Sequence, residues 1–135
     1  MHYSFDFAQG VHYPSNPLQP GPAYFKSARK CGIFGVACEP LNFQVNYLID
    51  EDDDPGKGAN ATISMLDHFL KNHAIQASQL CLHADNCVGQ NKNNFLMQYL
   101  LWRVMTKLNT SVTLSLMLVG HNKFAPNLSA TFPCP

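Results

Sequence analysis

The hydrophobic pattern changes period partway along the chain, and this change constrains the fold more than any other feature. Apolar and polar residues alternate in "HYSFDFAQ", where Tyr3, Phe5 and Phe7 share one face. Such alternation is typical of a strand with one buried face. Residues 31–39 and 43–51 predict two more strands, which the short turn "PLN" joins as a hairpin.

Beyond residue 59, helical spacing alternates with strand-like runs. The pattern predicts a helix, a strand, a helix and a strand, over residues 60–73, 79–85, 91–108 and 111–120. Asn60 suits the N-cap of the first helix, and Asp67 and Lys71 have the spacing of an (i, i+4) ion pair. Three strands followed by helix, strand, helix, strand predict an α/β fold, with an antiparallel meander joined to parallel strands in one mixed sheet.

Composition narrows the class of protein. A length of 135 residues with 46% hydrophobic residues indicates one folded domain, and a net charge of zero gives no basic surplus for nucleic acid. An odd number of cysteines, five, and the absence of a signal segment indicate an intracellular, reducing location. No apolar run has transmembrane length, so no membrane partner is expected.

Two carboxylates are the main candidates for chemistry. Asp6 lies on the polar face of the first strand, and Asp85 ends the strand 79–85. If these strands are parallel neighbours, the two acids lie side by side, and their repulsion calls for a shared proton or a divalent cation. Mg²⁺ is a candidate for that cation, because it prefers oxygen ligands and often binds through one or two carboxylates. Alternatively, Asp85 is a helix N-cap and Asp6 a solvent-facing strand residue.

The segment "HADNCVGQNKNN" places a run of polar side chains directly after Asp85. Near the start of a helix, Gln90, Asn91, Lys92 and Asn93 are candidates for contact with a nucleic-acid backbone. Turn formation, capping and a solvated lysine explain the same residues almost as well.

A zinc site is another interpretation of this region. Cys81, His83 and Cys87, with His121 after the last strand, are residue types that bind zinc. Buried free cysteines are more often small hydrophobic residues, and we prefer that interpretation. Another interpretation is that His83 and His121 flank the metal centre of Asp6 and Asp85 and hydrogen bond to its ligands.

Several segments together resemble a family of transposon-derived proteins abundant in animal genomes. The resemblance covers nearly the whole chain through "KCGIFGVACE", "QVNYLIDE", "YLLWRVMT" and "LVGHNKFAP", and its most specific part is the signature D-x-C-x-G-Q-N-K-N, here "DNCVGQNKN". It implies a ribonuclease H-like sheet and the Mg²⁺- or Mn²⁺-dependent DNA cleavage and joining of acidic-triad (DDE) transposases and integrases. Asp6 and Asp85 match the first two metal-binding acids, and Asn127 stands where the third is expected.

The resemblance also implies an incomplete domain. Similar proteins continue with a helix where this chain has an irregular tail over residues 120–135, so the last helix is expected to be missing or altered within the single domain 1–135. An active core implies DNA as partner, nuclear localisation and a homo-oligomer. Two alternatives are kept open, a catalytically inactive transposon remnant that at most binds partners, and a zinc-stabilised interaction module.

Overall fold

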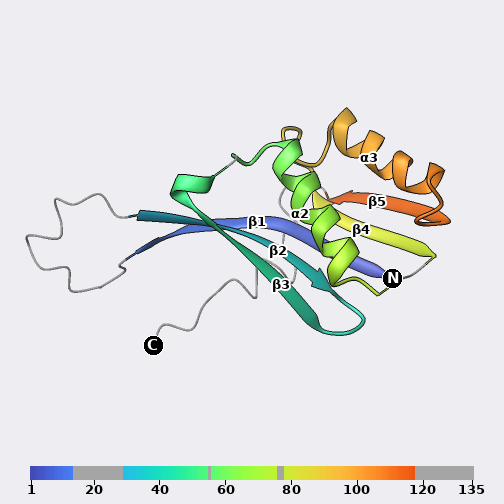
Figure 1. The fold of residues 1–135 in the computed structure, drawn as a ribbon, viewed down its shortest axis with the longest axis horizontal. Helices are drawn as coiled ribbons and strands as arrows, with labels where there is room; N and C mark the ends of the chain where they lie inside the picture. The colour runs from blue at the N-terminus through green and yellow to red at the C-terminus, as the bar shows by residue number, and fades with distance from the viewer. Residues whose placement is uncertain (14–28, 55, 76–77, 118–135) are drawn as a thin grey trace, which may run out of the picture.

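The computed structural model describes residues 1–13, 29–54, 56–75 and 78–117, which form one mixed sheet with helices packed on it (Figure 1). The strands are β1 (His2–Tyr13), β2 (Arg29–Cys38), β3 (Phe43–Asp50), β4 (Gln79–Asp85) and β5 (Ser111–Met117). The helices are α2 (Ala59–Asn72), α3 (Asn94–Met105) and the short 3₁₀ helix η1 (Glu51–Asp53). The predicted α/β class and element order are confirmed for this part of the chain.

The sheet has five strands in the order β3-β2-β1-β4-β5. The strands β1, β2 and β3 form the predicted antiparallel meander, and β4 runs parallel to both β1 and β5. The β2–β3 turn places Asn42 at a φ of 50°, a left-handed conformation that asparagine tolerates better than most residues. The first strand extends beyond its predicted end, because a register shift between Ala8 and Val11 lets it continue along β2 to Tyr13.

Both helices cover the same face of the sheet (Figure 1). Tyr3 and Phe5 of β1 point toward this face, and the Tyr3 ring meets the Phe69 ring of α2 edge to face, with ring centres 5.3 Å apart. Side chains from all these layers form one buried cluster: Tyr3, Phe5, Phe34, Val36, Leu66, Phe69, Leu80, Leu82, Leu96 and Leu100. Neither helix in the described residues is long and apolar enough to cross a lipid bilayer.

The other face of the central strands is buried as well. Ser4 and Asp6 on β1, and Ile33 and Ala37 on β2, are all less than a tenth exposed. Because strand residues alternate between faces, these are the neighbours of the core-facing residues. The polar face of β1 is therefore enclosed rather than open to bulk water.

Asp67 joins α2 to α3 through three donors. Its carboxylate accepts hydrogen bonds from Lys71, at the predicted (i, i+4) spacing and 2.6 Å, and from the Tyr99 hydroxyl at 2.8 Å. Arg103, only 6% exposed, lies 3.4 Å away. Burial alone would raise the pKa of Asp67, but the bonds from Lys71 and Tyr99 outweigh it and hold the pKa below the usual value. Burial, followed by the bond to Asp67, raises the pKa of Tyr99, which therefore stays a neutral donor.

The helix ends differ from the sequence predictions. α2 begins one residue before Asn60, so Asn60 lies in the first turn, and the N-cap Gly58 provides no side-chain bond. α3 begins at Asn94 rather than at residue 91, and the turn after it places Lys107 at a φ of 59°. Lys107 N–H donates to the Val104 carbonyl, so a left-handed residue ends this helix where glycine is usual.

We expect Asp67→Asn to reduce the free energy of unfolding at pH 7 by about 2 kcal/mol, because buried Arg103 loses its charged partner. The folded-state pKa of Asp67 is lowered, so its stabilisation is present above the unfolded pKa of about 3.9 and is lost as pH falls through the folded pKa. Urea unfolding from pH 7 to about pH 2.5 should show the gap between variant and parent closing in acid. Glu39→Gln, at an exposed turn, serves as control; a gap that persists in acid would contradict this role.

We expect Lys107→Gly to raise the free energy of unfolding by about 0.5–1 kcal/mol, because glycine adopts a positive φ without a clash at Cβ. Asn42→Gly is a matched comparison in the β2–β3 turn and should gain less, since asparagine already tolerates the left-handed region. Thermal unfolding of the two variants beside the parent would measure both effects. A larger gain at Asn42 would contradict the expectation.

Candidate metal centre at the end of β4

Strand β4 divides its side chains between the two faces of the sheet. Leu80, Leu82 and Ala84 enter the core under the helices, so Cys81, His83 and Asp85 lie on the opposite face. Asp85 is the last residue of the strand, as predicted, and lies at the carboxyl end of a strand with parallel neighbours on both sides. Ligands of open α/β sheets commonly bind at that edge.

The pairing of β1 with β4 brings the two predicted acids to the same level. The strands are parallel neighbours, which is the condition for the two acids to lie side by side, and Ser4 pairs with His83. Two residues further along both strands lie Asp6 and Asp85, on the same face, and adjacent strands are about 4.8 Å apart. Asp6 is 9% exposed and Asp85 half-buried. Their carboxylates therefore belong to one small region of the sheet.

Hydrogen bonds from the following turn orient Asp85. Its Oδ1 accepts from the Cys87 backbone N–H at 3.2 Å and from the Asn91 side-chain amide at 2.5 Å. Asp85 does not cap the helix: Asn93 is the N-cap of α3, and its Oδ1 accepts from the Leu96 N–H at 2.9 Å. Within the described residues, both bonds to the Asp85 carboxylate end on Oδ1, which leaves Oδ2 for a further ligand.

The amide-rich segment is a compact turn around one carbonyl. The Cys87 carbonyl accepts from the backbone N–H groups of Gln90, Asn91 and Lys92, at 3.3, 2.8 and 2.9 Å. Asn91 is 2% exposed and donates to Asp85, so its burial argues against the predicted contact with nucleic acid and assigns it to positioning the carboxylate. Lys92 is exposed, and Gln90 and Asn93 are partly exposed.

Two β1 residues on the same face as Asp6 were not among the predicted site residues. His2 Nδ1 and His83 Nε2 lie 3.3 Å apart with ring planes 12° from parallel, so one imidazole donates to the other. Ser4 is fully buried, and its hydroxyl has no hydrogen-bond partner among the residues described. The alternation of β1 already places Ser4 on the Asp6 face, but only the sheet pairing reveals its proximity to His83.

The zinc interpretation finds no support in the described ranges. No group of three or more His, Cys, Asp or Glu side chains there is placed to hold a metal, so Cys81, His83 and Cys87 do not form one site. Cys81 and Cys87 are half-buried free thiols. His121, Asn127 and the predicted irregular tail, residues 120–135, lie outside the described residues.

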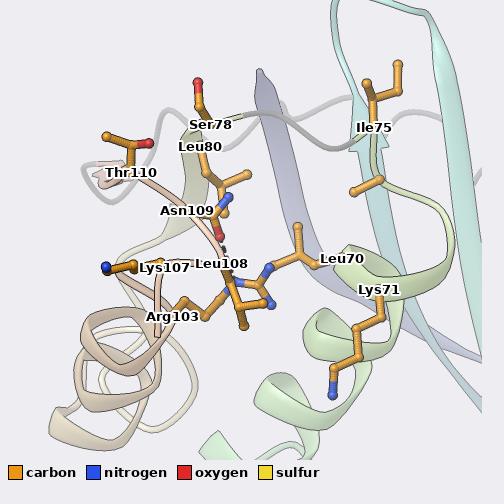
Figure 2. Close-up of a pocket in the computed structure, with 11 residues that line it drawn as sticks. Leu70, Lys71, Ile75, Ser78, Leu80, Arg103, Lys107, Leu108, Asn109 and Thr110 are labelled. Carbon is orange, nitrogen blue, oxygen red and sulfur yellow. Dashed lines mark hydrogen bonds between the residues drawn. The ribbon is translucent and has the colours of Figure 1, made fainter. Parts of the chain in front are cut away.

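A separate cavity lies at the other end of the parallel strands. It has a volume of about 520 Å³ between the last turns of α2 and α3, the start of β4 and the segment 107–110 that precedes β5. Figure 2 shows the Arg103 guanidinium in this cavity, bonded to Asn109 Oδ1 at 2.9 Å, while Lys71 and Lys107 point away from its centre. Cations in the last turn of a helix complement its dipole, which accounts for this basic lining.

Asn91→Asp tests the turn that holds Asp85. At pH 7 the new carboxylate would face the Asp85 carboxylate, and we expect a loss of at least about 3 kcal/mol in the free energy of unfolding. The paired carboxyls bind a proton more tightly when folded, so the loss should shrink as pH falls from 7 to about 5. Asn93→Asp is the control and should change stability by less than about 1 kcal/mol, because aspartate is also a good N-cap. Equal losses in the two variants would contradict the assignment.

Comparison with known proteins identifies one family. Residues 29–124 match a family described as a domain of unknown function, DUF7869. The match includes Asp85 and its turn, whereas Asp6 on β1 precedes it. No curated protein and no solved structure shows a significant match to the chain. Because the matching segment covers well over half of the sequence, the chain belongs to the DUF7869 family.

Proposed function

We propose that this chain is the catalytic core of a transposon-derived protein that binds Mg²⁺ or Mn²⁺ and cleaves or joins DNA. The observation that carries the proposal is the parallel pairing of β1 with β4, in which Ser4 lies opposite His83, so that Asp6 and Asp85 each follow two residues later on the same face of the sheet. The element order and the mixed sheet agree with the ribonuclease H-like fold that the signature implies. Work on DNA in an animal cell would place the protein in the nucleus.

The donor set fits magnesium or manganese better than zinc. Two carboxylates with room for water and phosphate oxygens are a common protein contribution to Mg²⁺ binding. The buried Ser4 hydroxyl, unpartnered among the described residues, is a further oxygen on the same face as Asp6. Structural zinc needs about four nitrogen or sulfur ligands, which this part of the chain does not gather.

Each residue of the site has a role in this proposal. Asp6 and Asp85 would hold the metal, which when bound helps to activate the attacking oxygen and to stabilise the leaving one. Asn91 and the Cys87 N–H keep Asp85 oriented. Lys92 is exposed after the turn, where its ammonium group can attract a phosphate. The contact with His2 orients the His83 imidazole on the face of the sheet that carries Asp85.

A second candidate is a catalytically inactive remnant that binds a partner or a metal without cleaving DNA. The specific observation in its favour is that no third ligating His, Cys, Asp or Glu joins the acid pair in the described ranges. Asn127, at the position expected for the third acid, brings an amide oxygen without charge. The two candidates agree on the fold and differ in whether DNA is cut.

Calorimetric titration with Mn²⁺ tests the shared site. We expect the parent protein to bind Mn²⁺, and Asp6→Asn and Asp85→Asn each to weaken binding at least about tenfold, because each removes one charge from the site. An amide at position 85 can still accept from Cys87 and Asn91, so the fold should survive. Asp53→Asn, at the end of the exposed 3₁₀ helix η1, is the matched control. Binding that is lost in Asp53→Asn and kept in Asp85→Asn would assign the metal to the acidic helix η1 instead.

Nicking of supercoiled DNA separates the two candidates. An active core predicts Mn²⁺-dependent nicking that disappears in Asp85→Asn. Metal binding without nicking would support the inactive remnant. If the Asp85→Asn variant still nicks DNA, the nicking does not come from this site.

A further inference from the structure

Helix α3 carries an apolar face that points away from the sheet. Met97, Leu101 and Met105 follow one another at intervals of four residues and are 55%, 59% and 73% exposed. Phe95 and Trp102 flank this row and are 64% and 47% exposed. These five residues are called the outer face of α3. Residues four apart lie on the same side of a helix, so Met97, Leu101 and Met105 form one apolar row, and the exposed Asn94 and Gln98 lie between this row and the two aromatic residues.

The opposite side of α3 packs the helix against the rest of the fold. Leu96 and Leu100 are buried in the core, and Arg103 reaches the Asp67 network. The outer face is therefore not needed to attach α3 to the sheet. Figure 1 places α3 beside α2 and near the edge strand β5, at the periphery of the layer of helices.

The size of the outer face fits a protein interface. Its exposed fractions correspond to on the order of 600 Å² of largely apolar surface, which reaches the upper range for the largest patch on a monomer. A standard interface buries about 800 Å² on each partner, including a polar rim. The outer face supplies most of that area before any rim residue is counted.

We propose that the outer face of α3 binds a second copy of this chain through a two-fold axis at Leu101. The row is symmetric about its centre, since Met97 and Met105 lie four residues to either side. In an antiparallel pair, Leu101 meets its own copy and Met97 meets Met105, the self-complementary arrangement that a two-fold interface requires. Ridges of residues four apart also pack well against each other.

The charge of the helix favours a second copy over an acidic or lipid partner. α3 contains one charged residue, Arg103, which is 6% exposed and turned inward. Two identical outer faces therefore meet without repulsion. A helix that lies on a membrane usually has a strongly charged polar face rich in lysine and arginine, which α3 lacks.

The chain contains a built-in reporter for this association. Trp102 is its single tryptophan and is half-exposed in the outer face. Sedimentation and tryptophan fluorescence should be measured from about 1 to 200 μM, because an interface near the lower end of the standard size is expected to bind in the micromolar range. We expect a dimer mass to appear as concentration rises, together with a blue shift of the emission as Trp102 leaves water.

Leu101→Glu should weaken the dimer at least about hundredfold, because two carboxylates would meet at the axis. Leu48→Glu is the matched control: Leu48 on β3 is 66% exposed, and its variant should dimerise like the parent. Circular dichroism checks that each variant is folded, and Leu101→Gln replaces Leu101→Glu if the latter does not fold. A parent that stays monomeric at 200 μM, or a dimer that loses affinity equally in both variants, would overturn the proposal.

Discussion

The parallel pair of β1 with β4 is the contact on which the rest of the structure depends. It joins the antiparallel meander to the strand–helix–strand half of the chain in one continuous sheet. It also lets Tyr3 and Phe5 share a core with α2 and α3. Without it the two halves would each present an unpaired strand edge and an apolar face. The alignment of Asp6 with Asp85 is a consequence of the same pair.

The pattern of the sequence was sufficient for the elements, for the antiparallel meander and for the presence of parallel strands. Alternation in β1 to β3 and helical spacing in α2 are local properties, and each predicted strand is found, β4 with both ends as predicted and the ends of β2 and β3 displaced by at most two residues. These features are set locally. Which strand lies beside β4 is a long-range detail, so the pairing of β1 with β4 entered the sequence argument only as a condition.

The sequence predictions were wrong where tertiary contacts or backbone hydrogen bonds determine the local conformation or the burial of a residue. Three N–H groups converge on the Cys87 carbonyl, so residues 91–93 form a turn although their composition also permits a helix start. Gly58 precedes α2 without a side-chain cap, so the capping ability of Asn60 was no guide. The burial of Asn91 and Ser4 depends on what packs around them, which spacing along the chain does not encode. An almost uniformly apolar α3 likewise gave no indication of which side would stay exposed.

The distance in sequence between β1 and β4 has a consequence for biosynthesis. β1 leaves the ribosome first and finds β2 soon afterwards, but its other edge has no partner until β4 has been made, nearly eighty residues later. At about 5–20 residues per second, this edge stays open for roughly 4–16 s on the nascent chain. An unpaired strand next to exposed Tyr3 and Phe5 is a site for wrong pairing with other chains. The nascent chain would therefore be most dependent on chaperones during that interval.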